Sequence, residues 1–217
     1  TIVDYSDEYE KIPYNYKGEI FLEITCRSFN IILKSGDRLN QLRLAFKKHS
    51  YIDDIELKKI DNKNSLLFSK NQIVKIDKGL KISVNLLSSN KIVAYCAKQN
   101  KKAIDFEKIN FHKITDYWEP IYANNNCITV EKNKFYILRS KEKVRIPSNL
   151  AGEMIPYDTG IGDFRAHYAG FFDPGFGDPN GSYAVLEVKT NELSFILEDG
   201  QTIARIKYEK LNKKSNI

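Results

Sequence analysis

The sequence contains no run of eighteen apolar residues and is poor in cysteine, methionine and tryptophan. Among its 217 residues there are three Cys, one Met and one Trp. A chain without a long apolar run has no ordinary membrane-spanning helix, and no basic-then-apolar leader of the secretory type opens it. Cys26, Cys96 and Cys127 are odd in number and far apart, which favours reduced thiols over a disulfide framework. These absences predict a soluble cytoplasmic protein that does not enter a membrane.

Positive charge is in excess but is not gathered into a stripe. Lys and Arg together number 34, against 28 for Asp and Glu, which gives a net charge of +6. The lysines are scattered singly or in short pairs such as Lys47-Lys48 and Lys213-Lys214. Nucleic-acid-binding proteins gather such charge on one face, so we predict a solvated surface and no nucleic-acid partner. The same positive field helps to recruit polyphosphorylated small molecules.

One stretch of sequence occurs twice, at a constant offset of 164 residues. Residues 22–44 align with residues 186–208, and the identical positions are Leu22/Leu186, Glu23/Glu187, Ile32/Ile196, Leu33/Leu197 and Gly36/Gly200. Apolar residues also face apolar residues at Ile24/Val188, Phe29/Leu193, Ile31/Phe195, Leu39/Ile203, Leu42/Ile206 and Leu44/Tyr208. A period this long exceeds that of solenoid repeats, so the repeat predicts two domain-sized units, each with a glutamate inside an apolar strand.

The hydrophobic pattern is typical of an all-β protein. Alternating or short apolar runs predict strands at 20–25, 29–33, 41–46, 73–76, 80–86, 92–95, 135–138, 184–188, 193–197 and 203–208. Turn signals separate these segments, with Gly36 and Gly200 at equivalent turns of the two copies. The stretch 97–126 is weakly patterned, and within it residues 103–111 predict a short helix.

Several motifs occur in an order that resembles the dCTP deaminase and dUTPase superfamily. They are Phe135-Tyr136-Ile137-Leu138, residues 144–153 (VRIPSNLAGE), residues 170–176 (GFFDPGF) and Leu186-Glu187. The first copy resembles the same superfamily at residues 12–23 (IPYNYKGEIFLE) and 36–42 (GDRLNQL). The likeness covers most of the chain and is strongest to the longer bacterial dCTP deaminases, which have two tandem β-clip units.

The resemblance implies an all-β, dUTPase-like β-clip barrel, with one complete unit and the C-terminal part of a preceding unit. Residues 1–50 are assigned to the first unit and residues 51–217 to the second. The first copy of the repeat begins at Leu22, close to the start of the chain, whereas in the second unit, which begins at residue 51, the copy begins only at Leu186. The first residue of the chain is Thr1 and not Met. We therefore predict a fragment or processed product that lacks the N-terminal part of the first unit.

The glutamate of each copy suits the chemistry that the resemblance implies. Hydrolytic deamination adds water to C4 of cytosine and expels ammonia, so one carboxylate can take a proton from water, protonate the ring nitrogen and protonate the leaving amine. Such work near neutral pH needs a pKa raised by an apolar setting, and both Glu23 and Glu187 lie between two apolar residues. We predict Glu23 as the first candidate for this proton shuttle and Glu187 as the second. The alternative is a solvent-facing glutamate on a half-exposed strand.

A zinc-activated water is the rival mechanism, because many nucleobase deaminases use a His-x-Glu and Pro-Cys-x-x-Cys set of residues. None of His49, His112 and His167 is followed two residues later by glutamate, and no Cys-x-x-Cys occurs. We expect no zinc and no protein metal site. The resemblance implies Mg²⁺ only as the companion of the triphosphate.

The candidate substrate-binding residues are Tyr16, Arg38, Gln41, Arg165, His167, Asp173 and Phe176. Arg38 and Gln41 match a family motif whose glutamine lies near the phosphates, and arginine's forked donors suit phosphate oxygens. Arg165 and His167 are polar groups close to the Asp173 turn. The alternative is that Arg38 and Arg165 are surface residues, each paired with an acidic side chain, and this accounts for either arginine equally well.

Two departures from the family pattern bear on activity. Asp173 is placed where dUTPases have their water-activating aspartate, whereas the first copy has Pro13 there, which favours deamination in the first unit. In the second unit, residues 155–160 stand where Arg-Ser-Ser is expected, and the loop 177–182 lengthens the approach to Glu187. The second unit is therefore either a scaffold or a second working centre.

The sequence as a whole predicts a dCTP deaminase that converts dCTP to dUTP and ammonia. The family's active sites lie between subunits of a trimer, so the resemblance implies a homotrimer, which would also cover exposed strand edges. A dUTPase-like diphosphohydrolase that uses Asp173 is the first alternative. A non-catalytic nucleotide-binding or structural subunit is the second.

Overall fold

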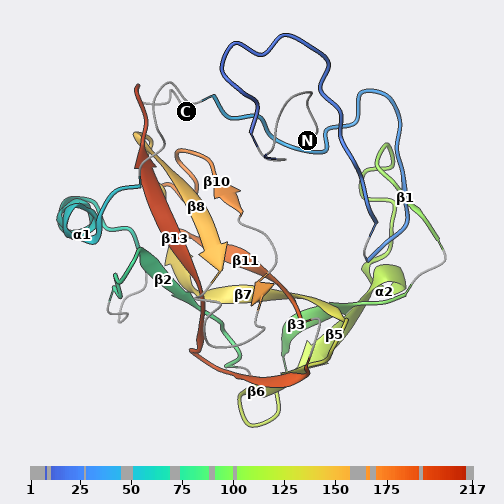
Figure 1. Cartoon of the computed structure of the whole chain (residues 1–217). Coiled ribbons are helices and arrows are strands. Elements are labelled where there is room, and N and C mark those ends of the chain that lie inside the picture. The colour runs from blue at the N-terminus through green and yellow to red at the C-terminus, as the bar shows by residue number, and fades with distance from the viewer. Residues whose placement is uncertain are drawn as a thin grey trace.

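The structure, a computed structural model, describes residues 8, 11–26, 28–44, 51–68, 74–87, 91–99, 102–156, 165–166, 170–190 and 193–213. This part of the chain is built mainly of antiparallel strands, with one helix of ten residues and one of four (Figure 1). The all-β prediction is confirmed. Among the described residues, no helix is both long and apolar enough to cross a membrane.

The larger sheet has five strands in the order β5-β3-β7-β11-β9. These strands are β5 (Trp118–Tyr122), β3 (Ile92–Ala97), β7 (Phe135–Val144), β11 (Ser182–Lys189) and β9 (Arg165–Ala166). The long strands β7 and β11 pair antiparallel from Ser182↔Val144 to Lys189↔Phe135. Strand β11 is therefore an interior strand, and a residue on it has neighbours from both sides.

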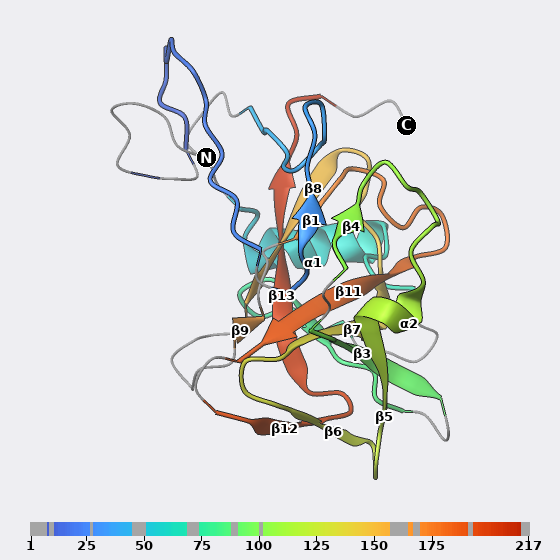
Figure 2. The same ribbon diagram turned by 90° about the vertical axis from the view of Figure 1, so that its right-hand side faces the viewer.

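The second sheet has four strands in the order β10-β8-β13-β2. They are β10 (Phe171–Phe172), β8 (Leu150–Pro156), β13 (Thr202–Lys210) and β2 (Leu80–Ser83). Two further pairs complete the fold, namely β12 (Phe195–Glu198) with β6 (Cys127–Val130), antiparallel, and β1 (Ile31–Ile32) with β4 (Ile104–Asp105), parallel (Figure 2).

One hydrophobic cluster joins the two sheets. It contains Leu138 of β7, Leu186 of β11, Ile82 of β2 and Ile206 of β13, all of them buried. Alternation along β11 buries Ala184, Leu186 and Val188 and leaves the residues between them on the opposite face of the sheet. Strand β11 thus has one face in the core and one face available for function.

Helix α1 (Asp54–Lys63) was not apparent from the hydrophobic pattern. Asp53 caps it, since its carboxylate accepts a hydrogen bond of 2.8 Å from the backbone N–H of Glu56. Leu57 is its fully buried side chain, so the helix shows little apolar periodicity. Helix α2 (Ile114–Tyr117) is a single turn that leads into β5. The helix predicted at 103–111 is wrong, because this stretch contains β4 and turns, with Asn110 at a φ of 58°.

The second copy of the repeat forms the strands that its pattern predicts. Residues 186–188 lie in β11, residues 195–197 in β12 and residues 203–208 in β13. Strands β2, β3 and β7 likewise confirm the segments predicted at 80–86, 92–95 and 135–138, with bounds that differ by a few residues. The strand predicted at 73–76 is wrong for its described part, because residues 74–76 form only an isolated bridge between Ile76 and Leu80, and residue 73 lies outside the described residues.

In its described part the first copy does not form most of the predicted strands, and the prediction is wrong there except at Ile31–Ile32. Only Ile31–Ile32 is a strand, while 20–25 is otherwise unpaired apart from a bridge at Phe21, and 41–44 has no regular structure. Residues 45–46 lie outside the described part of the chain. Leu22 is 42% exposed where its equivalent Leu186 is 1% exposed, and Leu42 is 70% exposed where Ile206 is 0% exposed. A strand needs partner strands to bury its apolar face. The described residues of the first copy have few such partners, so the same pattern stays exposed there.

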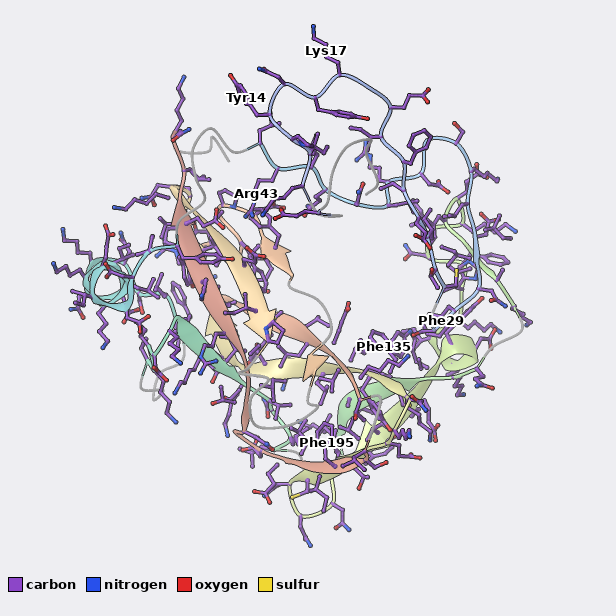
Figure 3. All side chains as sticks on the ribbon, in the orientation of Figure 1. Tyr14, Lys17, Phe29, Arg43, Phe135 and Phe195 are labelled. Carbon is purple, nitrogen blue, oxygen red and sulfur yellow. The ribbon has the colours of Figure 1, made fainter. Side chains whose placement is uncertain are left out.

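The described residues 11–26 and 28–44 instead run as an irregular segment over the outside of the β structure (Figure 1). At one place β1 pairs with β4, and the ring of Phe29 contacts those of Tyr117 and Trp118, with centroids 5.6 and 5.1 Å apart. At another, Arg43 donates a hydrogen bond of 3.0 Å to Glu209 on β13 (Figure 3). The segment therefore contacts both sheets, although most of its described apolar residues remain exposed.

Candidate active site on strand β11

Glu187 lies on the face of β11 that points away from the core. Its neighbours in sequence, Leu186 and Val188, are buried in the core, while Glu187 itself is half-buried. In the register of the sheet it stands opposite Ile137 of β7, and Ile137 in turn stands opposite Tyr95 of β3. The carboxylate therefore projects from the middle of a continuous sheet.

The surroundings of Glu187 on this face are largely apolar. Ile137 lies directly across from it, and Val185 and Phe135 occupy neighbouring positions of the same face. Burial raises the pKa of the Glu187 carboxyl above its ordinary value, because the ionised form is less well solvated there than in water. A carboxylate with a raised pKa can exchange protons with a bound water and a ring nitrogen near neutral pH.

An aromatic cluster closes one end of this face. The ring of Phe135 lies 6.0 Å from that of Trp118, and Trp118 contacts Phe29 of the N-terminal segment. Phe29 and Phe135 are more than a hundred residues apart in the sequence, yet they approach the same part of the sheet (Figure 3). The first-copy segment thus contributes to the boundary of the face that carries Glu187, even though it forms no sheet of its own.

Glu23, the first candidate from the sequence, is placed differently. It lies in the irregular segment, outside any strand, and its side chain is exposed. The structure does not provide the apolar strand setting that its sequence neighbours predict. Of the two glutamates, Glu187 has the half-buried setting that the proposed chemistry needs.

The remaining candidates of the first copy are also exposed or engaged locally. Arg38 and Gln41 have exposed side chains in the irregular segment. The Tyr16 hydroxyl donates a hydrogen bond of 2.6 Å to the backbone carbonyl of Glu19, which closes a local turn. Their roles as substrate-binding residues stay predictions. The second-copy arginine at the equivalent strand, Arg205, is buried and donates from Nε to the backbone carbonyl of Asp77 at 3.1 Å, which gives it a structural contact.

Asp173 and Phe176 belong to a turn that is docked on the end of β7. The backbone N–H of Ile146 donates to the Phe176 carbonyl at 2.9 Å, and the N–H of Gly175 donates to the Ile146 carbonyl at 2.8 Å. Phe176 packs against Phe172, with ring centroids 4.9 Å apart, whereas Asp173 is exposed. Phe176 is thus held by the fold, and Asp173 is free to meet solvent.

Two further candidates are Arg165 and His167, and between residues 157 and 169 the structure describes only residues 165–166. Only the backbone of Arg165 is described, in strand β9 opposite Lys189 of β11, two residues from Glu187. His167 lies outside the described residues, as do residues 157–160 of the segment 155–160 that replaces Arg-Ser-Ser. Their roles stay predictions.

Three residues on the same face of the sheet as Glu187 were not selected from the sequence. Arg139 of β7 stands opposite Val185, and Tyr183 stands opposite Lys143. The Arg139 guanidinium and the Lys143 ammonium lie 4.5 and 5.3 Å from the centroid of the Tyr183 ring. A cation at every second residue from 139 to 145 was the signal in the sequence, but only the pairing of β7 with β11 places two of these charges beside Tyr183.

The described residues contain no group of three or more His, Cys, Asp or Glu side chains that could hold a metal ion. Mg²⁺ would reach this site only with a triphosphate substrate, and that expectation stays a prediction.

The raised pKa of Glu187 has a consequence for stability. A carboxyl whose pKa is higher in the folded than in the unfolded protein binds more protons when folded, so stability falls as pH rises through that interval. Glu187→Gln removes this loss, and we expect the variant to be more stable than the wild type at pH 7. The advantage should shrink as pH falls below the ordinary carboxyl value of 4.5.

Urea unfolding at pH 7 and pH 4 measures this difference. The exposed residue Glu198 of β12 offers a matched control, because Glu198→Gln removes the same charge without relieving burial. A gain for Glu187→Gln that is equal at both pH values would contradict the assignment of a raised pKa to this carboxyl.

Comparison with known proteins agrees with the sequence motifs. A family model described as the 2'-deoxycytidine 5'-triphosphate deaminase (DCD), C-terminal domain, matches residues 53–217, and the model of the DCD N-terminal domain matches residues 1–48. A search of curated proteins gives no match.

Among solved structures, the crystal structure of 2'-deoxycytidine 5'-triphosphate deaminase from Agrobacterium tumefaciens matches with 38% sequence identity and a TM-score of 0.69. The match covers 76% of this chain and 49% of that chain, so the chain spans about half the length of this relative. The likeness confirms the prediction of a dUTPase-like β-clip fold. The chain belongs to the 2'-deoxycytidine 5'-triphosphate deaminase family.

Proposed function

We propose that this protein deaminates dCTP by hydrolysis, giving dUTP and ammonia, and that Glu187 moves the protons without help from zinc. One observation supports this most directly. Glu187 is a half-buried carboxylate with a raised pKa, next to the apolar residues Ile137 and Val185 of the five-stranded sheet, in a chain of the deaminase family.

The proposed reaction moves two protons, and both pass through the Glu187 carboxylate. Glu187 accepts a proton from water as the water oxygen bonds to C4 of cytosine, and it passes that proton to N3 of the ring. It then accepts the proton of the new C4 hydroxyl and delivers it to the amino group, which leaves as ammonia while the C4 carbonyl forms. The carboxylate ends in its starting state, so one glutamate suffices and no electron leaves or enters the substrate.

The apolar surroundings of Glu187 favour this cycle. Ile137 and Val185 limit the solvation of the carboxylate, which raises its proton affinity toward that of the groups with which it must exchange. Glu23 is the second candidate for this role, since its copy of the motif is the more family-like of the two. The substrate would carry Mg²⁺ on its phosphates, and we propose a homotrimer in the cytoplasm as the working form.

Product analysis tests this function. The purified protein is incubated with Mg²⁺ and either dCTP or dUTP, and ammonia, dUTP and pyrophosphate are measured. We expect equimolar ammonia and dUTP from dCTP, with no pyrophosphate from dUTP. Pyrophosphate released from dUTP would instead support a diphosphohydrolase that uses the exposed Asp173. Nucleotide binding without either product would overturn the catalytic proposal and leave a binding subunit.

A further inference from the structure

Two positive charges on the Glu187 face have no carboxylate partner in the described part of the chain. Strand β7 and the residue after it carry cations at 139, 141, 143 and 145. Lys141 pairs with Asp199 and Arg145 pairs with Asp178. Arg139 and Lys143, by contrast, both lie against the ring of Tyr183, at 4.5 and 5.3 Å from its centroid. The two charges are therefore concentrated on one small area of the sheet.

This arrangement leaves positive charge that a bound anion would neutralise. The negative face of an aromatic ring attracts a cation, but it carries no net charge and does not cancel the repulsion between two cations. The ring restricts the positions of both side chains, so they lose less conformational entropy when they bind a ligand. Arg139 presents forked donors and Lys143 a compact ammonium, a pairing that suits phosphate oxygens.

The pair lies at a suitable place relative to Glu187. Tyr183, Val185 and Glu187 follow each other on one face of β11, because Ala184 and Leu186 between them are buried. Tyr183 and Glu187 are four residue steps apart along the strand, which corresponds to about 13 Å. Val185, 60% exposed, lies between them and offers an apolar surface. A carboxylate, an apolar patch and two cations thus follow one another in a line.

This order matches the order of groups in a nucleotide, in which an amine-bearing base is joined through a sugar to phosphates. Arg139 stands diagonally from Glu187 across the strand pair, where Cα atoms are roughly 7–8 Å apart. Its guanidinium nevertheless lies over Tyr183 and makes no ion pair with Glu187. The cation is therefore available to a ligand and does not hold the carboxylate in its ionised form.

We propose that Arg139 and Lys143, held against Tyr183, bind the phosphates of a nucleotide that lies along β11 with its base at Glu187. The proposal rests on the proposed function for the identity of the base, but the phosphate subsite itself is defined by these three residues. This subsite would make the protein bind a nucleoside triphosphate in preference to the corresponding nucleoside, because its charged contacts are to the phosphates and lie away from the reacting carbon.

Steady-state kinetics with dCTP and with deoxycytidine tests the subsite. Arg139→Gln and Lys143→Gln should each raise KM for dCTP by about tenfold or more, since each removes a charge-assisted contact. Neither should change kcat by more than about twofold, because the contact is the same in ground and transition states. KM for deoxycytidine should stay unchanged. Arg139→Lys should recover part of the loss, and the exposed Lys132 provides a control, Lys132→Gln, that removes the same charge elsewhere.

Binding of inorganic tripolyphosphate, followed by calorimetry, separates this proposal from the proposed function. We expect the wild type and Lys132→Gln to bind it and the folded Arg139→Gln/Lys143→Gln double variant to lose at least about tenfold in affinity. That result would support the subsite even if no deamination occurred. Active deamination with KM for dCTP unchanged in both single variants would overturn the subsite and leave the proposed function standing.

Discussion

Glu187→Gln is expected to lower kcat for dCTP deamination by at least about a thousand-fold, within the range that a general acid-base group contributes. Gln keeps the size and hydrogen-bonding shape of Glu but neither accepts nor releases a proton in this pH range. The proton transfers at water, N3 and the leaving amine all depend on that exchange. The affinity for dCTP should change little, because Glu187 lies at the base end of the site and away from the proposed phosphate contacts. Single-turnover release of ammonia and calorimetric binding of dCTP measure the two quantities separately.

The matching control is Glu198→Gln on β12, an exposed glutamate that should leave both quantities unchanged. The variant Glu23→Gln tests which of the two repeated glutamates transfers the protons. If Glu23→Gln is inactive while Glu187→Gln retains full turnover, the proton shuttle belongs to the first copy and our assignment is wrong.

Leu197→Ala is expected to destabilise the protein by about 3–4 kcal/mol, as fully buried leucines do when truncated. Leu197 is 0% exposed on β12 and belongs to the cluster that joins the two sheets. The truncation removes apolar contacts and leaves a cavity that the surrounding strands fill only in part. Urea unfolding, followed by far-UV circular dichroism, gives the change in the free energy of unfolding.

The repeat provides an internal comparison for this effect. Leu33 is the same residue at the equivalent position of the first copy, yet it is 36% exposed. Leu33→Ala should therefore cost no more than about 1 kcal/mol, as surface substitutions do. Equal losses for the two variants would mean that the first copy is buried in solution by an interaction that this structure does not contain.

Much of the fold follows from local sequence pattern. The alternation in residues 184–188 predicts a strand with one apolar face, and β11 has that face in the core. The order of the motifs around 144–153 and 170–176 predicts the β-clip family, which the comparisons bear out. These signals are local or depend only on order along the chain, so a single sequence contains them in full.

Other features depend on what a segment packs against. The first copy has the same apolar pattern as the second, but in its described part it pairs as a strand only at Ile31–Ile32, so Leu22 is exposed whereas Leu186 is buried. Helix α1 shows little hydrophobic periodicity because Leu57 is its buried residue. The Asp53 cap and the packing of Leu57 stabilise it without a broad apolar stripe. The helix predicted at 103–111 does not form, because the stretch has only a weak local preference for helix and residues 104–105 pair instead with β1.

The candidate site combines both kinds of information. The sequence by itself determined that a glutamate lies between two apolar residues in each copy. Where such a segment forms a strand, alternation places the glutamate on the face opposite its apolar neighbours, because this follows from the covalent geometry of the backbone. Only the tertiary structure decided that Glu187 is the half-buried one. It also decided which cations of β7 lie beside Tyr183, since the register shift between Tyr183 and Val185 directs Arg139 and Lys143 to the ring while Lys141 pairs with Asp199. Burial and convergence are properties of segments distant in the chain, and no spacing along the sequence specifies them.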